Sequence, residues 1–382
     1  MSRVLLAWEL GGNLGHVVAL LGLARGLRER GHQVLFAMRD LSNAAMLARE
    51  GFSFVPAPSP WHQRKPTLYP SYVAMLEGEV FPSANATLVA ALAWRSIMRA
   101  AGAELVVADH APVAMLAARA LKLRTAAFGV PFSIPIAGQD LPVFADKHAS
   151  QVEEQRLLKR LNSVLTALGA PSMERASDLY RADATMVRCL PEVDCFGPRS
   201  DDAYAMMPAG DAGDAIPEWP KADGPRALVY LKAGPDVKPV LQALASSGLS
   251  TIAYIGGLAR RDTPLKRPGM LVTNTLFKSS ALTPQADLVI CNGNAGTVTG
   301  ALLAGKPVLM LPQYMEQALT ARRVVDAGAG AVPERRTAAA MTRCFDALRP
   351  GGSAAAAAAR LARRSPAKLE HVVQRVESVL YA

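Results

Sequence analysis

Residues 287–330 read DLVICNGNAGTVTGALLAGKPVLMLPQYMEQALTARRVVDAGAG and show the clearest structural pattern in the chain. The apolar run at 287–291 predicts a buried strand, and the small and polar residues after it predict a loop. A helix is expected to begin near Gly296 and Thr297, and the run PVLML (307–311) predicts a second strand. Strands joined through a helix in this way are parallel members of one sheet. Ligands bind such sheets at the carboxyl ends of the strands, where amides at a helix start attract phosphate.

The same alternation of strand and helix continues on both sides of this segment. Apolar runs and helical spacing predict strands at 3–8, 33–38, 104–108, 124–130, 227–231, 250–255 and 270–274, and helices at 16–30 and 111–121. A segment rich in Pro, Asp, Ala and Gly separates the two sets. We therefore predict an α/β fold with two Rossmann-like, doubly wound parallel sheets. The expected parts are an N-terminal domain 1–215, a linker 216–225, a C-terminal domain 226–364, and a helix at 365–382 that packs back on the sheets.

The composition is that of a globular protein. Of the 382 residues, 51% are hydrophobic and 19% are charged, which leaves enough apolar material for buried sheets. The length exceeds that of one ordinary core and predicts two domains. Four cysteines without a C-x-x-C pair predict a reducing compartment. The N-terminus shows no signal-peptide core, and no apolar run approaches the roughly 18 residues of a membrane helix, so a cytoplasmic protein is expected.

The formal net charge of +10 favours an anionic partner. The basic residues are scattered without interleaved aromatic side chains, which disfavours a nucleic-acid groove. A phosphorylated small molecule and an anionic membrane surface both fit the charge. Contact with the surface of such a membrane stays open, as does self-association into a homodimer.

Three segments resemble the donor-binding half of the family 1 glycosyltransferases, which are GT-B enzymes that use nucleotide-activated sugars. The family pattern His-Gly-Gly-x-Gly-Thr is met by 292–297, which read NGNAGT. The pattern Ala-Leu-x-x-Gly-x-Pro is met by 301–307, and the pattern Pro-x-x-x-Asp-Gln-x-x-Asn-Ala by 312–321. The departures from the family are Asn292 in place of His, Asn294 in place of Gly, and Thr320 in place of Asn.

This resemblance implies a site for a nucleoside-diphosphate sugar on the C-terminal sheet. The diphosphate would lie against 296–297, and hydroxyls of the donor sugar against 316–317. The Asn292 amide can donate to a phosphate oxygen but cannot become cationic. Lys232 and Gly234 follow a predicted strand and would add a cation and backbone amides near the same edge. The expected donor-binding residues are Lys232, Gly234, Asn292, Gly293, Asn294, Ala295, Gly296, Thr297, Glu316 and Gln317.

The segment 11–37, GGNLGHVVALLGLARGLRERGHQVLFA, resembles the N-terminal signature of the same family, in which a Gly-His pair begins the first helix. His16 then occupies the position of the catalytic base. An imidazole at the carboxyl end of the first strand can remove a proton from an acceptor hydroxyl near neutral pH. Asp109 follows the strand 104–108 at the same edge and matches the family's dyad aspartate, which would fix the tautomer of the base. His110 is the rival candidate for the base, although it matches no family position.

Other features of the N-terminal half also bear on function. GGNLGH lacks the G-x-G-x-x-G spacing, and Arg39 rather than an acid follows the second strand, so a dinucleotide site is disfavoured. His32 lies at a helix-to-strand turn and is expected to be structural. Two long loops carry aromatic and proline residues that suit a hydrophobic acceptor. The expected acceptor-binding residues are Trp61, Tyr69, Phe132 and Phe144.

The resemblance implies an inverting glycosyltransferase whose two domains face a central cleft. It would move a sugar from a UDP- or dTDP-sugar to a hydroxyl of a hydrophobic small molecule or lipid, with His16 and Asp109 as catalytic residues. The donor is a co-substrate, so no separate cofactor is expected. No acidic D-x-D motif accompanies either sheet, which agrees with metal-independent chemistry. The alternatives are a non-catalytic nucleotide-sugar-binding accessory subunit and a GT-B nucleotide-sugar epimerase.

Overall fold

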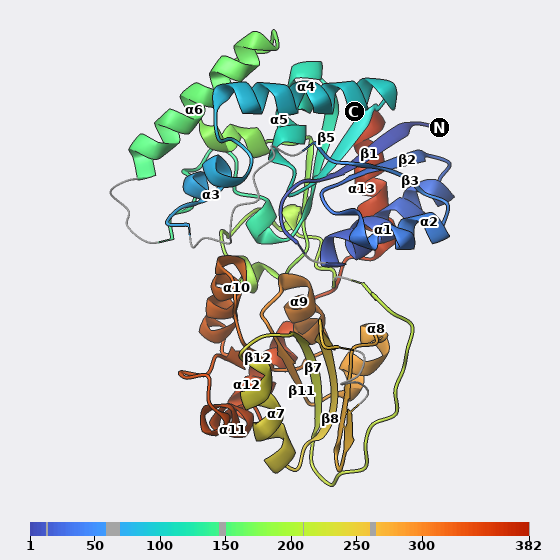
Figure 1. Ribbon diagram of the computed structural model, residues 1–382, viewed down its shortest axis with the longest axis vertical. Coiled ribbons are helices and arrows are strands. Elements are labelled where there is room, and N and C mark those ends of the chain that lie inside the picture. Colours follow the sequence, from blue (N-terminus) through green and yellow to red (C-terminus); the bar gives the residue numbers. More distant parts are fainter. Residues whose placement is uncertain (13, 59–68, 145–149, 209, 260–264, 382) are drawn as a thin grey trace. The chain divides into compact units, whose positions relative to one another are not determined.

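A computed structural model describes residues 1–12, 14–58, 69–144, 150–208, 210–259 and 265–381 (Figure 1). The chain divides into two compact units. Unit 1 comprises Met1–Val187, Arg199–Ala205 and Ala367–Ala382, and unit 2 comprises Arg188–Pro198 and Met206–Pro366. Each unit is built on a sheet of its own.

The described part of unit 1 contains a six-stranded sheet in the order β3-β2-β1-β4-β5-β6. Neighbouring strands in this sheet are parallel throughout. The central strands β1 and β4 are buried along nearly their whole length, as strands covered by helices on both faces are. The strands are β1 (Arg3–Trp8), β2 (Gln33–Met38), β3 (Ser53–Pro56), β4 (Leu105–Asp109), β5 (Arg124–Gly129) and β6 (Ala184–Val187).

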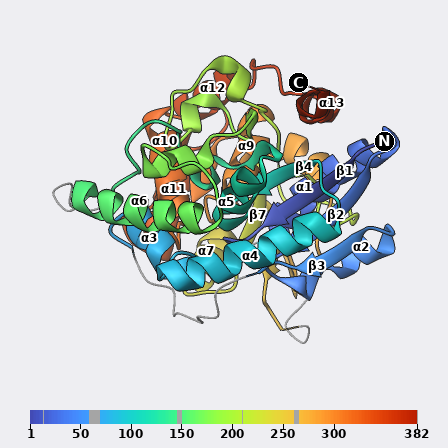
Figure 2. The same cartoon turned by 90° about the horizontal axis from the view of Figure 1, so that it is seen from above.

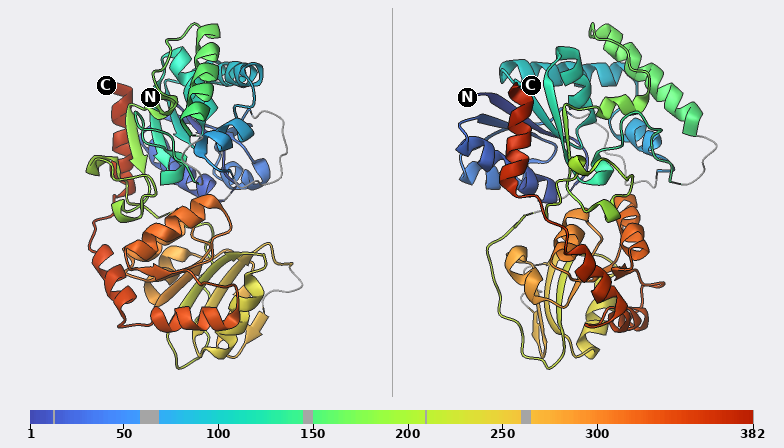
Figure 3. Two further views of the ribbon diagram at one scale, coloured as in Figure 1. Left: turned by 90° about the vertical axis from the view of Figure 1, so that its left-hand side faces the viewer. Right: turned by 180° about the vertical axis from the view of Figure 1, so that it is seen from behind.

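Helices cover both faces of this sheet. The β1-α1-β2 and β4-α5-β5 connections run in opposite directions along it. Right-handed crossovers therefore place α1 (Leu14–Glu29) and α5 (Pro112–Leu121) on opposite faces. The C-terminal helix α13 (Leu369–Tyr381) lies beside α1, in contact with β4, β5 and β6 (Figure 3). Its buried valines recur at helical spacing, which explains why this amphipathic helix packs on the sheet.

Further helices extend the layer formed by α5. The long helix α4 (Ala84–Ala100) packs against α5, and α6 (Ser150–Ala167) lies beside α4 (Figure 2). The short helix α3 (Tyr72–Glu79) contacts α6, and α2 (Ala45–Arg49) contacts β3. Among the described helices of the whole chain, none is both long enough and apolar enough to span a bilayer.

The described part of unit 2 contains a seven-stranded sheet in the order β13-β12-β11-β7-β8-β10-β9. Its strands pair in parallel except at one edge, where β9 runs antiparallel to β10. The strands are β7 (Arg226–Lys232), β8 (Ser250–Gly256), β9 (Leu265–Arg267), β10 (Met270–Thr273), β11 (Leu288–Cys291), β12 (Val308–Met310) and β13 (Gly330–Ala331).

The helices of unit 2 also divide between two faces, because the β7-α7-β8 and β11-α9-β12 connections run in opposite directions. On one face α7 (Val237–Ser246) packs against α11 (Ala338–Ala347). On the other face α9 (Ala295–Leu303) packs against α12 (Ser353–Leu361). The remaining helices with α geometry are α8 (Ser279–Leu282) and α10 (Met315–Asp326).

The predicted α/β class, with two doubly wound and mainly parallel sheets, is confirmed. The segment 216–225, which we expected to be a linker, lies within unit 2. Trp219 anchors this segment, because its indole Nε1 donates to Gln285 Oε1 at 3.2 Å and the Arg226 guanidinium lies 5.4 Å from its ring centroid. The chain instead passes between the units after Val187, Pro198, Ala205 and Pro366.

The contact between α1 and α13 depends on a glycine. A Cβ on Gly26 would lie 2.5 Å from Cγ2 of Val373, whereas a Cβ on Gly22, one turn earlier, would meet nothing within 4 Å. The stiff valine cannot turn away easily. We expect Gly26→Ala to lower the free energy of unfolding by about 1–3 kcal/mol. The matched control Gly22→Ala should raise it by up to about 1 kcal/mol through helix propensity. Denaturant titration checks both values, and equal effects would contradict this packing.

Candidate active site

Both sheets have a topological switch point, where helices leave two adjacent central strands in opposite directions. In unit 1 these strands are β1 and β4, and in unit 2 they are β7 and β11. A crevice forms at the carboxyl ends of such strands, and ligands of open α/β sheets bind there. His16 lies in the first turn of α1, directly after β1, and Asp109 is the last residue of β4. The two sequence-predicted catalytic residues therefore meet at the switch point of unit 1.

The side chains of His16 and Asp109 form a buried hydrogen bond. The distance from His16 Nδ1 to Asp109 Oδ2 is 2.8 Å, across 93 positions of sequence. His16 is 7% exposed and Asp109 is fully buried. A neutral imidazole that donates from Nδ1 carries its lone pair on Nε2, so the carboxylate selects the tautomer that can accept a proton there.

Neighbouring residues fix the two side chains. The Trp8 ring stacks on His16, with centroids 5.2 Å apart and planes 19° from parallel. Gly129 makes room for the carboxylate, because a Cβ there would lie 2.9 Å from Asp109 Oδ1. Gly11 has φ +87°, and a Cβ there would lie 2.5 Å from His16 Nε2. A larger residue at position 11 would therefore crowd the nitrogen that carries the lone pair.

His110, the rival candidate for the base, belongs to a buried network. Its Nε2 lies 3.2 Å from Tyr72 Oη, and the Tyr72 hydroxyl donates to the Phe132 carbonyl at 3.0 Å. Burial lowers the pKa of His110 to about 3, and repulsion from His16 contributes to this shift. A ring that holds a proton so weakly is a poor base near neutral pH. The geometry therefore favours His16.

Two of the predicted acceptor-binding residues lie together. Phe132 and Phe144 stack with centroids 5.9 Å apart, and Tyr72 lies 5.4 Å from Phe132. Tyr69 instead donates its hydroxyl to Glu79 Oε1 at 2.8 Å. Trp61 lies outside the described residues. Phe132, Phe144 and Tyr72 thus form an aromatic cluster next to His110.

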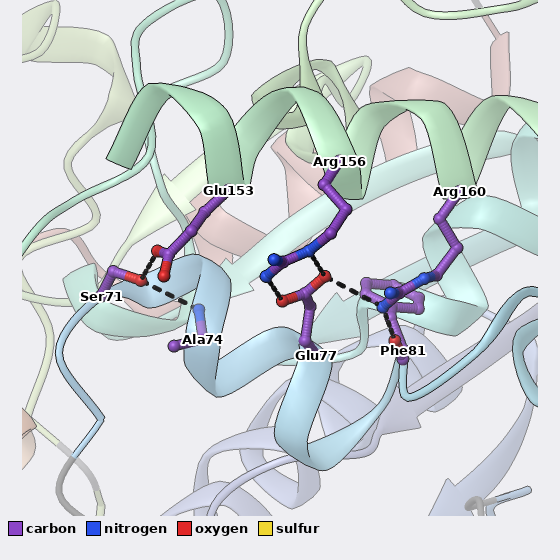
Figure 4. Close-up of polar contacts among 7 residues, drawn as sticks. All are labelled: Ser71, Ala74, Glu77, Phe81, Glu153, Arg156 and Arg160. Carbon is purple, nitrogen blue, oxygen red and sulfur yellow. Dashed lines mark hydrogen bonds and ion pairs between the residues drawn. The ribbon is translucent and has the colours of Figure 1, made fainter. Parts of the chain in front are cut away.

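Helix α6 braces α3, which carries the tyrosine of this cluster (Figure 4). Arg156 donates to both oxygens of Glu77, and Arg160 lies 3.1 Å from the same carboxylate. The Ser71 hydroxyl, which caps α3, donates to Glu153 Oε2 at 2.9 Å. An exposed ion pair alone contributes little, but several charges linked to one carboxylate hold two helices in register. The brace therefore fixes the helix behind the aromatic cluster.

The predicted donor-binding residues of unit 2 also share one edge. Lys232 is the last residue of β7, and Gly234 follows two positions later. The segment 292–297 follows β11 and enters α9. The first turn of α10, after β12, contains Glu316 and Gln317. These strands are neighbours in the order β12-β11-β7. The sequence-distant segments of the predicted site therefore meet at one sheet edge.

Asn292 ties three strand ends together. Its Oδ1 accepts from the Lys232 N–H at 2.9 Å, and its Nδ2 donates to the Leu311 carbonyl at 3.0 Å. The residue is only 3% exposed. The amide that we expected to face a phosphate thus fixes the ends of β7 and β12 on either side of β11.

Gln317 has a similar bridging position. Its Oε1 accepts from the Gln313 N–H at 2.8 Å, and its Nε2 donates to Asn294 Oδ1 at 3.1 Å. Gln317 is 2% exposed. Gly293, at φ +91°, lets the loop approach, because a Cβ there would lie 3.1 Å from the Gln317 carbonyl oxygen. The loop before α9 is therefore locked to the loop before α10.

The start of α9 is the part of this edge suited to a phosphate. Asn294 is its N-cap residue, and the amides of Ala295, Gly296 and Thr297 belong to its first turn, where N–H groups have no partner within the helix. Lys232 is exposed, and its Nζ lies 6.0 Å from the centroid of the Tyr314 ring. Partial desolvation of its ammonium group by the surrounding residues lowers the pKa of Lys232. A cation and a helix N-terminus thus lie on the same sheet edge.

Some residues of the two candidate sites were not predicted from the sequence. Trp8 and Gly11 shape the surroundings of His16, and Gln313 and Tyr314 line the edge after β12. Their position at the end of an apolar strand or within four residues of it was an available signal. Among the described residues, no group of three or more His, Cys, Asp or Glu side chains could hold a metal ion.

Comparisons with known proteins agree with this architecture, although no family model matches the chain. The zeaxanthin glucosyltransferase of Pseudescherichia vulneris is 26% identical over 360 residues, which cover 82% of this chain and 82% of the relative. A calicheamicin glycosyltransferase superposes with a TM-score of 0.72 at 20% identity and covers 100% of this chain and 98% of its own. A spinosyn rhamnosyltransferase complexed with thymidine diphosphate superposes with a TM-score of 0.69 at 19% identity. The match covers 98% of this chain and 100% of the rhamnosyltransferase chain. The predicted GT-B fold and the resemblance to family 1 are confirmed.

The bridging role of Asn292 predicts a pH-dependent effect of Asn292→Asp. A buried carboxylate cannot donate to the Leu311 carbonyl, so the variant should lose about 1–3 kcal/mol of unfolding free energy at pH 8. A protonated carboxyl can donate, so the loss should shrink as the pH falls toward 5. The control Asn85→Asp, at an exposed position near the start of α4, should stay within about 0.5 kcal/mol of the wild type. Denaturant titration at both pH values measures the difference, and a pH-independent loss would refute the bridge.

Proposed function

We propose that this protein, a relative of the family 1 glycosyltransferases with the GT-B fold, transfers a sugar from a nucleoside-diphosphate sugar to a hydroxyl of a small hydrophobic acceptor. The observation that carries the proposal is the buried His16–Asp109 hydrogen bond of 2.8 Å at the switch point of unit 1. A histidine oriented by a carboxylate is the arrangement by which proteins remove a proton from a hydroxyl. This pair argues against a donor-binding protein without catalysis.

The proposed reaction is one displacement at the anomeric carbon. His16 Nε2 takes the proton of the acceptor hydroxyl while Asp109 stabilises the imidazolium that forms. The acceptor oxygen forms a bond with the anomeric carbon, and the bond from that carbon to the diphosphate oxygen breaks with its electron pair on the diphosphate. Attack opposite to the leaving group inverts the configuration of the sugar.

Unit 2 would hold the donor and stabilise the leaving diphosphate. The first-turn amides of α9 and the ammonium of Lys232 would face the developing negative charge. These groups would supply the positive potential that a metal ion supplies in other transferases, so we propose metal-independent chemistry. The thymidine diphosphate of the spinosyn rhamnosyltransferase structure supports a dTDP-sugar as donor, and a UDP-sugar is the alternative.

The acceptor would contact the aromatic cluster of unit 1. Phe144 is partly exposed and stacks on the buried Phe132, which lies near His110, the residue after Asp109. Large apolar pockets with a few polar groups suit hydrophobic ligands. The zeaxanthin glucosyltransferase, by its name, acts on such a compound. We therefore propose a carotenoid, a polyketide or another hydrophobic natural product as the acceptor class.

A non-catalytic nucleotide-sugar-binding subunit is the second candidate. It is favoured by Asn292 and Gln317, whose side chains bond within the protein instead of standing ready for the donor. An epimerase would need the donor site but not the His16–Asp109 pair. Binding of UDP- or dTDP-sugars without transfer or hydrolysis would favour the accessory subunit.

The role of His16 predicts a large loss of turnover in His16→Ala. With UDP- and dTDP-sugars and a panel of hydrophobic acceptors, kcat should fall by about 10²–10⁴ because no base remains. Donor affinity should stay within about threefold, since the proposed donor contacts lie in unit 2. The control His371→Ala removes an exposed histidine of α13 and should leave kcat unchanged. Transfer by His16→Ala at the wild-type rate would remove the base assignment.

Gly11 predicts a steric effect on the same nitrogen. Gly11→Ala would place a Cβ 2.5 Å from His16 Nε2 and should lower kcat/KM by about 10–100-fold. Gly12→Ala is the matched control, because a Cβ there meets nothing within 4 Å. Initial-rate measurements on both variants, with circular dichroism to verify folding, decide the point. Equal activities would show that Nε2 needs no space on this side.

A further inference from the structure

Glu9 is a buried carboxyl group that the proposed reaction does not use. It follows β1 directly and is 3% exposed. Its Oε2 accepts from the Val113 N–H at 2.8 Å, and its Oε1 accepts from the Ala114 N–H at 2.6 Å. Because Pro112 begins α5, these are amides of the first turn of that helix. Glu9, just after β1, thus caps a helix whose capped amides lie 104 and 105 positions later in the chain.

Burying this carboxyl group is unfavourable. Burial raises the pKa of Glu9 to about 8, although the two amide hydrogen bonds oppose the rise. The charged and titratable groups that face it are Arg39, beyond the end of β2, and Tyr180, while the uncharged Trp94 faces it from α4. The Arg39 guanidinium donates to the Glu9 backbone carbonyl at 3.1 Å. Because burial of a carboxyl group costs free energy, we expect Glu9 to have a structural role that compensates for this cost.

The role follows from what α5 carries at its N-terminus. The turn between β4 and α5 consists of Asp109, His110 and Ala111. His110 has φ +50°, a backbone conformation that residues other than glycine adopt only at a cost in free energy. Such a turn persists only where its surroundings hold it. The Leu10 N–H donates to the His110 carbonyl at 2.9 Å. The turn is therefore hydrogen-bonded on both sides of Ala111, to Leu10 before it and to Glu9 after it.

The same segment leads to the histidine. The chain runs from β1 through Glu9 and Leu10 to Gly11 and on to His16 in the first turn of α1. A rigid link between this segment and the β4–α5 turn therefore sets the distance between the imidazole and the carboxylate of Asp109. Without the Glu9 hydrogen bonds, the two elements would be connected here by the β1–β4 pairing, which ends at Trp8 and Asp109, and by the Leu10–His110 hydrogen bond.

We propose that Glu9 is a positioning residue for the His16–Asp109 pair, whose carboxyl group grips the first amides of α5 and so fixes the turn of Asp109 against the segment that leads to His16. The catalytic consequence rests on the proposed function. The geometric claim does not, because the His16–Asp109 bond can be followed directly by NMR.

Two substitutions at Glu9 test separately the length of the side chain and its two acceptor oxygens. Glu9→Asp keeps the carboxyl group but shortens the side chain by one bond, about 1.5 Å, so it cannot reach both amides. Glu9→Gln keeps the length but offers one acceptor oxygen in place of two. Glu50→Asp is the control, since Glu50 pairs with Arg25 at the exposed end of α2. We expect kcat to fall about 10–100-fold in Glu9→Asp and about 3–10-fold in Glu9→Gln, with KM values within about threefold.

The second readout is the titration of His16, assigned by comparison of histidine NMR spectra with those of His16→Ala. Displacement of Asp109 from Nδ1 removes stabilisation of the imidazolium, so the measured pKa of His16 should fall in both Glu9 variants and stay constant in Glu50→Asp. A cap that serves stability alone would lower the denaturation midpoint and leave this pKa unchanged. Either folded variant with wild-type kcat and an unchanged His16 pKa overturns the proposal.

The two proposals fail in different ways. If the wild-type protein transfers no sugar but the pKa of His16 still falls in the Glu9 variants, the proposed function is wrong and the positioning role stands. If the wild type transfers sugar and neither readout moves, the positioning role is wrong.

The raised pKa of Glu9 predicts a trend in stability with a definite sign. Between about pH 4.5 and 8 the folded protein keeps the proton that the unfolded chain releases, so rising pH favours unfolding in this window. Glu9→Gln removes this contribution. The denaturation midpoint of the wild type should therefore decline between pH 5 and 8 relative to that of Glu9→Gln. Parallel curves for the two proteins would show that Glu9 does not titrate there.

Discussion

The hydrogen bond between His16 Nδ1 and Asp109 Oδ2 joins the two halves of a doubly wound sheet at the point where its winding reverses. β1 and β4 are adjacent, but their following helices depart to opposite faces. The carboxyl ends of these two strands therefore lie next to each other without a helix between them. This constraint allows two side chains 93 positions apart to meet in a buried pair. Every other feature of the unit 1 site serves to hold or surround this pair.

Glycines and a stacked ring complete the arrangement. Gly11 and Gly129 are placed where a Cβ would press on His16 Nε2 and on the Asp109 carboxylate. Trp8 holds the imidazole plane. At the corresponding edge of unit 2, Asn292 and Gln317 hold the strand-end loops around the start of α9. A preorganised set of amides stabilises a developing anion without rearrangement during the reaction.

The strands and helices could be predicted from the sequence because apolar runs and helical spacing are local signals. The meeting of His16 and Asp109 could also be predicted, since both follow strands of one parallel sheet. The capping of α5 by the distant residue Glu9 could not be predicted. Glu9 reaches Val113 across 104 positions, and nothing local in the sequence marks that pairing.

Polar residues at strand ends also proved ambiguous. The pattern around 316–317 resembles a sugar site, yet the Gln317 amide is buried and bonds to Asn294 and Gln313. Residue type alone does not distinguish a side chain that awaits a ligand from one that joins two loops. The segment 216–225 shows the same limit, because its composition suggests a linker while Trp219 fastens it to unit 2.

We propose that Asp109 orients His16 and makes it basic enough to act as the base. The pH dependence of kcat/KM, measured for the wild type and for Asp109→Asn, reports on this role of Asp109. The amide can still accept the Nδ1 proton, but the negative charge that stabilises the imidazolium is lost. In Asp109→Asn, the acidic limb of the profile should therefore move to lower pH by about 1–3 units, together with a loss of rate. An acidic limb that stays at the same pH in Asp109→Asn would show that Asp109 does not raise the basicity of His16.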